Sequence, residues 1–227
     1  MQLIPPPLGS RRIWLIRHAQ SEGNRDNIIQ GHFDTPLTDF GHGQARALAE
    51  WFATSTVQER WPVHSIHASD LHRAWQTAEA VGRRLQMLPV TRHFELREAN
   101  FGHWEGRSAS ELRNEDPSNY ERWKAEKRWR PHWCENFWTL QQRGLGALNH
   151  LLRSYPGNLV VVSHGGLIYG LVAHWANHLV TRIYNCGVTE LTFRPDGSVS
   201  IEQVSFLPPG VEVSPEMRPG SLSEFYR

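Results

Sequence analysis

The first residues equipped for chemistry are Arg17 and His18, which follow the apolar run Ile13–Ile16. A guanidinium can clamp a phosphate through two parallel charge-assisted hydrogen bonds. An imidazole beside it can attack phosphorus and carry the group covalently. The pair therefore predicts phosphoryl transfer through a phosphohistidine. Taken alone, a solvated strand end with a structural histidine explains residues 15–24 equally well.

A second polar segment follows another short apolar run and contains Ser69, Asp70 and Arg73. Ser69 or Asp70 is a suitable helix N-cap, because a short oxygen-bearing side chain can accept a hydrogen bond from the first turn. Arg73 would then lie in that first turn, where a helix N-terminus also favours an anion. We expect Arg73 to reach the crevice that holds Arg17, although an isolated arginine here would be a surface residue.

The segment from Glu95 to Gly106 offers carboxylates for acid–base chemistry. Glu98 is the candidate general acid and base, because Gly102 and Gly106 permit sharp turns around it. Glu95 and Glu105 are alternatives. In the absence of a function, any one of these glutamates would be a solvated loop residue.

A second histidine, His164, follows the continuously apolar run Leu159–Val162 and precedes Gly165 and Gly166. Two glycines allow a helix to begin close to a ligand. A structural histidine satisfied by the backbone is the alternative interpretation, but it does not explain the glycine pair.

The elements that must position these groups alternate along the chain. Apolar runs predict strands at Ile13–Ile16, Ile66–Ala68, Leu159–Val162 and Val188–Phe193, and three- and four-residue apolar spacing predicts helices at Gln44–Phe52, Leu71–Leu85 and Phe137–Leu152. This alternation predicts a three-layer α/β/α fold with a mainly parallel central sheet. The polar groups that follow the strands should then meet at the carboxyl edge of the sheet.

Length and composition limit the classes of function. The chain has 227 residues and a net charge of +1, which gives no reason to expect binding to nucleic acid or an anionic membrane. No apolar run reaches membrane-spanning length and the N-terminus lacks a secretory core, so we expect a cytoplasmic protein. Cys134 and Cys186 are expected to be reduced thiols. His132 lies near Cys134, but two further metal ligands are missing, so no metal is expected.

We expect a single domain over residues 1–227, with a core at about 11–206, a lid at about 101–138 and an extended tail at 207–227. The lid segment contains five of the ten tryptophans together with several lysines and arginines. These aromatic side chains form either the core of a helical cap or an apolar wall with a cationic rim for substrate. The sequence leaves a homodimer open.

Taken together, the segments resemble the histidine phosphatase superfamily, the phosphoglycerate mutase-like branch 1, from Ile13 to about Phe193. The resemblance rests on five ordered motifs: Arg17-His18 with Ser21-Glu-Gly-Asn24; Gln30-Gly31 through Gly41; Ser69-Asp-Leu-x-Arg73 through Ala78; Glu98 through Gly106; and Ser163-His-Gly-Gly166 with Asn185-Cys-x-Val-Thr189. It implies the phosphoglycerate mutase-like α/β fold.

The resemblance also implies roles for individual residues. His18 matches the nucleophile and Glu98 the proton donor. The phosphate pocket and its rim correspond to Arg17, Asn24, Gln30, Gly31, Arg73, His164 and Gly165. The implied reaction uses neither a metal nor a cofactor, and its partner is a small-molecule phosphomonoester.

Two departures from the family pattern affect these expectations. Ala19 stands where the family most often has glycine, and we expect little effect. The later family motif Pro-x-Gly-Glu-Ser is replaced by a segment ending Cys134-Glu135-Asn136, in which Glu135 keeps its spacing to Arg143. The shape of this loop at the lid edge is therefore left open.

The connection after Glu98 favours a phosphatase over a mutase. Trp123 is followed by Lys124 and Ala125, where mutases carry an arginine pair, and no second phosphate site is evident. Mutase-type phosphotransfer, a protein phosphatase and a catalytically silent binding module remain as alternatives, because fold alone does not determine function.

Overall fold

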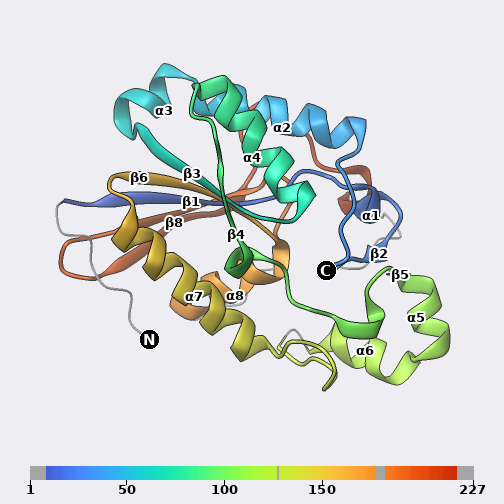
Figure 1. Cartoon of the computed structure of the whole chain (residues 1–227). Helices are drawn as coiled ribbons and strands as arrows, with labels where there is room; N and C mark the ends of the chain where they lie inside the picture. Colours follow the sequence, from blue (N-terminus) through green and yellow to red (C-terminus); the bar gives the residue numbers. More distant parts are fainter. Residues whose placement is uncertain (1–8, 127, 177–181, 219–227) are drawn as a thin grey trace.

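The computed structural model describes residues 9–126, 128–176 and 182–218. A six-stranded sheet in the order β4-β3-β6-β1-β7-β8 forms its centre (Figure 1). The strands are β1 (Arg11–Arg17), β3 (Val63–Ser69), β4 (Thr91–His93), β6 (Asn158–Ser163), β7 (Val188–Phe193) and β8 (Val199–Phe206). The pairs β1–β6, β3–β6 and β3–β4 are parallel, whereas β7 is antiparallel to both β1 and β8. The mainly parallel sheet confirms the predicted fold class.

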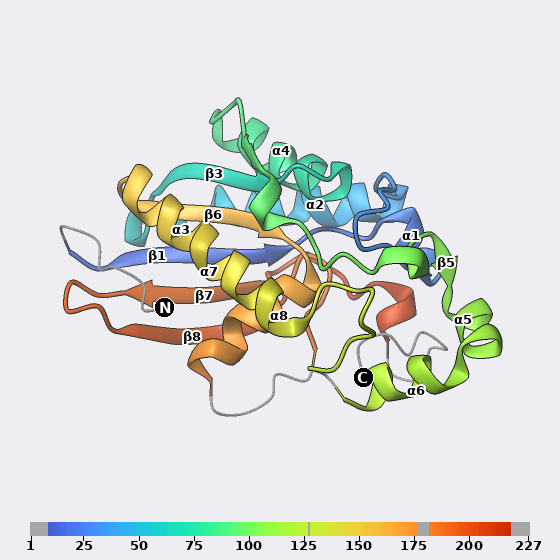
Figure 2. The same ribbon diagram turned by 60° about the horizontal axis from the view of Figure 1, so that its bottom comes forward.

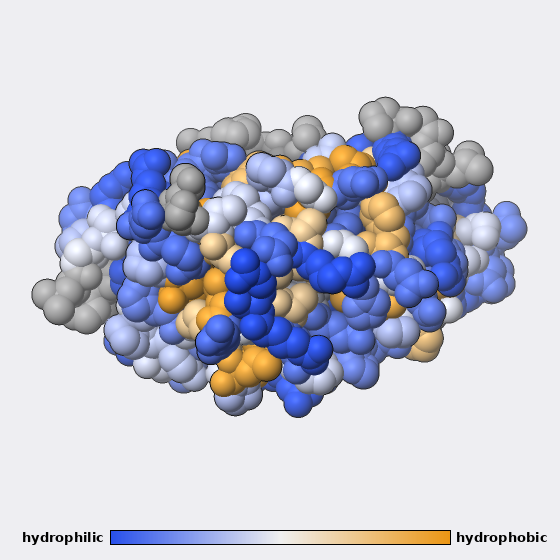
Figure 3. Space-filling view, turned by 90° about the horizontal axis from the view of Figure 1, so that it is seen from above, coloured by the Kyte–Doolittle hydropathy of each residue, from blue (hydrophilic) through white to orange (hydrophobic). Residues whose placement is uncertain are grey.

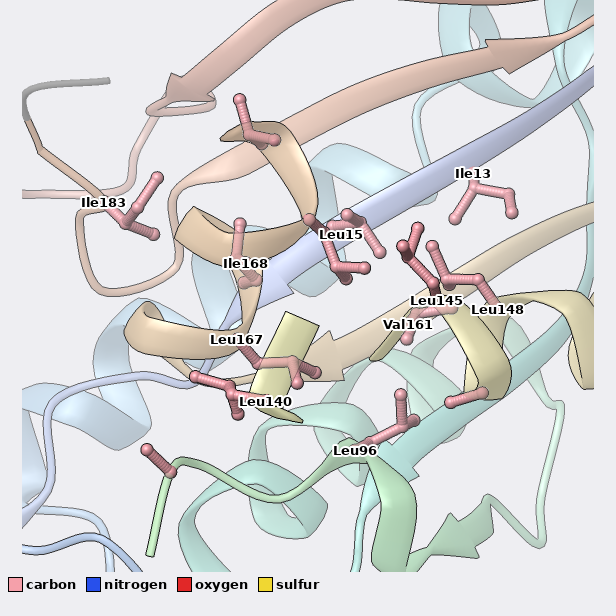
Figure 4. Close-up of a cluster of buried hydrophobic side chains, with 14 of the residues drawn as sticks. Ile13, Leu15, Leu96, Leu140, Leu145, Leu148, Val161, Leu167, Ile168 and Ile183 are labelled. Atoms are coloured by element: carbon pink, nitrogen blue, oxygen red, sulfur yellow. The ribbon is translucent and has the colours of Figure 1, made fainter. Parts of the chain in front are cut away.

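Strand β1 shows why both faces of the sheet need a cover. Successive side chains on a strand point to opposite faces. Ile13 and Leu15 pack into one buried apolar cluster, and Trp14 and Ile16 pack into a second one. Figure 4 shows Ile13 and Leu15 with the other labelled members of the first cluster. A strand that is apolar on both sides must lie in the middle of a three-layer structure.

Helices cover the two faces. Helices α2 (Asp39–Phe52), α3 (Ser55–Arg60) and α4 (His72–Leu85) lie on one face, and α7 (Phe137–Ser154) and α8 (Gly165–Trp175) lie on the other (Figures 1 and 2). The outer side of the first layer is mostly hydrophilic, with scattered apolar residues (Figure 3). No helix in the described ranges combines the length and apolar character needed to cross a bilayer.

The predicted helices are present, with shifted boundaries. Helix α2 begins at Asp39 because Thr38 accepts a hydrogen bond from the Gly41 amide at 3.0 Å. Helix α4 begins at His72, and its N-cap is Leu71 with no side-chain cap bond, so the predicted cap at Ser69 or Asp70 is wrong. Gly144 lies inside α7, where a Cβ would be 3.0 Å from Leu167 of α8, so the glycine allows close helix packing.

The smaller elements gather at the end of the sheet toward which β1 points (Figure 2). They are α1 (Glu22–Arg25), β2 (Ile28–Ile29), η1 (Phe94–Leu96), η2 (Gly102–Trp104), β5 (Arg107–Ser108), α5 (Ala109–Glu115), α6 (Pro117–Ala125) and η3 (Pro215–Met217). Strand β2 pairs with β5 in a separate two-stranded sheet.

The lid segment has an aromatic core of its own. Trp104 and Tyr120 are fully buried, and the ring centroid of Trp104 lies 5.7 Å from that of Trp123 and 6.1 Å from that of Trp133. Trp138 is 58% exposed. The first of the two interpretations of the lid tryptophans therefore applies to Trp104.

The expectation of an extended tail is wrong for residues 207–218; residues 219–227 lie outside the described residues. Val211, Ser214 and Met217 are buried. The reason is a set of polar contacts with distant residues, among them a hydrogen bond of 3.0 Å from Gln44 to the Ser214 hydroxyl. This part of the chain folds back against the main domain.

Candidate active site

Three strands end side by side and deliver the candidate residues to one edge of the sheet. Strand β1 ends at Arg17, β3 at Ser69 and β6 at Ser163, and β6 is the parallel neighbour of both β1 and β3. The amide of His18 donates a hydrogen bond of 2.9 Å to the carbonyl of Ser163. His18 and His164, the first residues after β1 and β6, therefore lie next to each other at the sheet edge.

The His18 ring is held in one orientation and one tautomer. Its Nδ1 lies 2.7 Å from the Ala19 carbonyl oxygen, which can only accept, so Nδ1 carries the proton. Nε2 then keeps a lone pair, and it accepts a hydrogen bond of 3.3 Å from Arg73 Nε. Burial, with the charges of Arg73 and Arg17, holds the pKa of His18 well below its usual 6.5. The imidazole is therefore neutral and nucleophilic near pH 7.

Ala19 fits the backbone without strain. It is not among the described residues with a positive φ, so its Cβ carries no penalty. Its amide donates a hydrogen bond of 3.0 Å to the Thr77 hydroxyl in α4. The departure from glycine at this position is accommodated, as expected.

Both pocket arginines are almost completely buried, and each is anchored to the backbone. Arg73 Nη2 donates to the Gly31 carbonyl at 2.7 Å, and Nη1 forms an ion pair of 3.1 Å with Asp34. Arg17 Nη1 donates to the Ile183 carbonyl at 2.8 Å. These contacts hold two positive charges beside His18, where a phosphate dianion would need them.

His164 completes the cluster from the other strand. It is fully buried, and its ring centroid lies 5.2 Å from that of His18. Neither ring nitrogen has a hydrogen-bond partner among the described residues. Burial, followed by the charges of Arg73, His18 and Arg17, holds its pKa well below 6.5. Buried polar atoms without partners are rare in native structures, and here they indicate a site prepared for a ligand.

Glu98 reaches the site from the loop between η1 and η2. Its Oε2 accepts a hydrogen bond of 2.9 Å from the Gly166 amide in the first turn of α8, and its Oε1 accepts one of 2.9 Å from the Ala99 amide. A Cβ on residue 166 would collide with the Glu98 carboxylate, which explains why the second residue of the glycine pair is glycine. The side chain is buried yet lines the cleft, so it can exchange a proton with a bound ligand.

The two alternative carboxylates lie elsewhere. Glu105 accepts hydrogen bonds from the backbone amides of His32, Phe33 and Phe101 at 2.8–3.1 Å, so it organises two loops. Glu95 is exposed. Neither lines the cleft that contains His18 and Glu98.

The loop at the lid edge keeps its anchor despite the altered motif. Glu135 forms a salt bridge of 2.8 Å with Arg143, and Arg143 Nη2 donates to the Glu98 carbonyl at 3.1 Å. Asn136 caps α7 by accepting from the Thr139 amide at 2.9 Å. Asparagine thus supplies a cap where the family pattern has serine, and Cys134 donates from Sγ to the Phe101 carbonyl at 3.3 Å.

The candidate residues of the pocket rim converge on a single cleft. Arg17, His18, Asn24, Gln30, Gly31, Glu98 and Gly165 line it, and it holds about 1190 Å³ of space including the part open to solvent. Arg73 and His164 are not among the lining residues; both are buried beside the His18 ring, with Arg73 Nε 3.3 Å from His18 Nε2 and the His164 ring centroid 5.2 Å from that of His18. Asn24 Oδ1 accepts a hydrogen bond of 3.2 Å from Asn185 Nδ2, and Gln30 Oε1 accepts one of 2.8 Å from the Thr35 hydroxyl, so both amides are fixed.

Sequence reasoning missed part of the cleft wall. The lining residues that no prediction named include Ile28, Tyr169, Arg182, Ile183, Glu216 and Met217, whereas Phe101, Trp123, Lys124 and Arg130 belong to the predicted lid segment. Trp123 and Lys124 lie in the lid, so the second interpretation, an apolar wall with cationic neighbours, also holds for part of it. Glu216 and Met217 lie in the tail, where no motif pointed to them.

Neither the two cysteines nor His132 lines the cleft. Cys134 and Cys186 are buried free thiols. The His132 ring packs against Trp133 at 4.7 Å between centroids. Across the described part of the chain, no three His, Cys, Asp or Glu side chains are grouped as metal ligands.

Comparison with known proteins agrees with this geometry. The family model described as "Histidine phosphatase superfamily (branch 1)" matches residues 13–204. The chain belongs to this superfamily. The match includes every residue assigned above to the strand ends and to the Glu98 loop, and it stops before the turn that contains Glu216.

Two curated relatives of this histidine phosphatase are phosphatases. This chain is 36% identical over 171 residues to the glucosyl-3-phosphoglycerate phosphatase of Mycolicibacterium vanbaalenii, and the alignment covers 72% of this chain and 73% of the relative. This chain is also 34% identical over 168 residues to the adenosylcobalamin/alpha-ribazole phosphatase of Salmonella typhimurium, and that alignment covers 71% of this chain and 78% of the relative. These relatives support phosphomonoester hydrolysis as the activity.

Solved structures of histidine phosphatases share the fold. A mycobacterial glucosyl-3-phosphoglycerate phosphatase in complex with VO3 superimposes with a TM-score of 0.74 at 28% identity, covering 86% of this chain and 98% of that one. The alpha-ribazole phosphatase from Shigella flexneri gives a TM-score of 0.72 at 29% identity, and the match covers 88% of this chain and 99% of that one.

Proposed function

We propose that the protein hydrolyses small-molecule phosphomonoesters through a phosphohistidine on His18, without a metal. The observation that carries this proposal is the His18 ring itself. Its Nδ1 is fixed on the Ala19 carbonyl and its Nε2 lone pair faces the guanidinium of Arg73. A buried neutral imidazole beside two arginines and a carboxylate has the properties that attack on a phosphate requires.

In the first step, His18 Nε2 attacks phosphorus in line with the ester oxygen. The N–P bond forms while the P–O bond to the alcohol breaks. Arg17 and Arg73 stabilise the charge on the equatorial oxygens, and His164 donates its ring N–H to one of them. Protonated Glu98 gives its proton to the leaving alkoxide, which departs as the alcohol.

In the second step, the Glu98 carboxylate takes a proton from a water molecule, which attacks phosphorus on the face the alcohol has left. The P–N bond breaks and inorganic phosphate is released, so His18 returns to its neutral form. Each acid–base role is worth about 10²–10⁴-fold in rate. The amides of Gly166 and Ala99 keep Glu98 in place for both steps.

The cleft wall supports a substrate whose alcohol part is partly apolar. Phe101, Trp123 and Tyr169 contribute aromatic surface, and Lys124 and Arg130 contribute positive charge near it. From the net charge and the hydropathy pattern given above, we further propose a cytoplasmic location and no nucleic-acid partner. A homodimer is the assembly to test. A panel of phosphorylated metabolites assayed with the purified protein would identify the substrate.

The proposal is tested by trapping the intermediate. Rapid quench of the wild-type enzyme with p-nitrophenyl phosphate should give an acid-labile, base-stable phosphoryl adduct on His18, and turnover should survive EDTA. His18→Ala should abolish both adduct and turnover, whereas His72→Ala, an exposed histidine at the start of α4, should retain them. An active His18→Ala variant would disprove the mechanism.

A further inference from the structure

The turn at the C-terminal end of the described chain is part of the wall of the phosphate site. Glu216 and Met217, in the 3-10 turn η3, line the same cleft as Arg17 and His18. Met217 is 5% exposed and Ser214 is 1% exposed. A C-terminal segment without contacts to the rest of the domain would leave these side chains exposed to solvent.

The first contact of the turn is with Arg17. The Met217 sulfur lies 3.4 Å from Arg17 Nη1, the nitrogen that also donates to the Ile183 carbonyl. The Met217 carbonyl accepts a hydrogen bond of 2.8 Å from Arg182 Nη1, which holds the turn in place. A guanidinium at a strand end has several rotatable bonds, and these contacts restrict it to one geometry.

The second contact is with the loop that follows His18. Gln20 Nε2 donates a hydrogen bond of 2.5 Å to Glu216 Oε2, and Gln20 Oε1 accepts one of 2.6 Å from the Thr38 hydroxyl. Gln20 is buried and lies two residues after His18. Its amide is thus held between the tail and the start of α2.

The third contact runs through Asn185. The Ser214 hydroxyl donates to Asn185 Oδ1 at 3.2 Å, and Asn185 Nδ2 donates to the His18 carbonyl at 2.9 Å and to Asn24 Oδ1 at 3.2 Å. Buried polar groups in such a network support one another, because each is costly to leave unpaired. The turn is therefore coupled to both sides of the phosphate site.

We propose that the turn Ser214–Arg218 positions the phosphate site, with Met217 and Glu216 as positioning residues for Arg17 and for the His18–Ser21 loop. The inference rests on the proposed function and adds to it a determinant outside the matched family region. The turn acts on the phosphoryl group that every substrate shares. Its loss should therefore weaken binding of any phosphate ester, irrespective of the alcohol.

The test compares truncating and conservative variants of the full chain. Met217→Ala and Glu216→Ala should each raise the KM for p-nitrophenyl phosphate and the inhibition constant of vanadate by about tenfold, with a smaller change in kcat. Met217→Leu keeps the volume and Glu216→Gln keeps an acceptor for Gln20, so both should recover most of the affinity. Glu212→Ala is the matched control, because that carboxylate is exposed on the same tail.

Three outcomes would overturn the inference. The first is wild-type affinity in both alanine variants. The second is equal losses in the alanine and conservative variants. The third is a loss shared with Glu212→Ala and accompanied by a lower melting temperature, which would indicate general destabilisation. Calorimetric binding of vanadate needs no turnover, so an enzyme that binds vanadate but does not hydrolyse esters would count against the proposed function alone.

Discussion

Substituting alanine for Gly166 should separate proton donation by Glu98 from phosphate binding. A Cβ on residue 166 would lie 3.1 Å from Glu98 Cδ and 3.3 Å from Oε2, and closer still to Oε1. Real Cβ atoms do not approach an oxygen so closely, so the carboxylate must move by about 1 Å, a displacement that can cost 10²-fold in rate. The Gly166 amide and the phosphate pocket remain, because only a methyl group is added.

The expected loss depends on the leaving group. Hydrolysis of an alkyl phosphate should fall by about 10²-fold, since a poor alkoxide needs a proton in the transition state. The burst of p-nitrophenol from p-nitrophenyl phosphate should stay close to that of the wild type, because this leaving group needs no proton. The burst should then be followed by slow turnover, since water activation also depends on Glu98.

Rapid-mixing kinetics on both substrates, with melting curves as a check on folding, would measure these effects. Gly146→Ala provides the control: residue 146 lies in α7 and its Cβ would meet nothing within 4 Å. That variant should be more stable by about 0.5–1 kcal/mol and kinetically unchanged. Wild-type rates for alkyl phosphates in Gly166→Ala would refute the assignment of Glu98 as the proton donor.

Two further predictions concern single side chains. Glu98→Gln should show the same leaving-group dependence as Gly166→Ala. Glu105→Gln should destabilise the fold by about 1–3 kcal/mol without such dependence, because it disturbs hydrogen bonds to partly buried backbone amides. Burst kinetics and urea unfolding distinguish the two variants. His67 is buried beside His93, and burial, with the charges of His93 and His150, lowers its pKa from 6.5 to about 4. The unfolded chain therefore binds a proton first as the pH falls, and the free energy of unfolding should be about 2 kcal/mol lower at pH 5 than at pH 7. A His67→Gln variant should lose that part of the pH dependence, and an unchanged dependence would contradict this explanation.

The sequence predicted the sheet edge well because the information there is local. Apolar runs end directly at Arg17 and at Ser163, so the residues that follow had to meet at the carboxyl ends of parallel strands. The choice of Glu98 over Glu95 and Glu105 came from the family motif. The structure adds the physical reason, since of the three only Glu98 lines the cleft.

The features that sequence reasoning missed depend on distant contacts. Gln20 and Glu216 are separated by 196 residues, and no sequence pattern near either residue predicts their hydrogen bond. Helix α4 starts without a side-chain cap, so a rule based on capping placed its start too early. Strand β4 has no buried residue and β8 has one, and neither strand has an apolar run long enough to predict it.

The central position of β1 has a consequence for how the chain reaches its native state. Its parallel partner β6 lies far along the chain; Arg12 hydrogen-bonds to Asn158 across 146 residues. Such distant pairing makes folding slow. Until β6 has been synthesised, the apolar side chains of β1 have no strand to pair with on that side, and a nascent chain would be prone to aggregation. Strand β1, which ends one residue before His18, is thus synthesised before both of its sheet partners, β6 and β7.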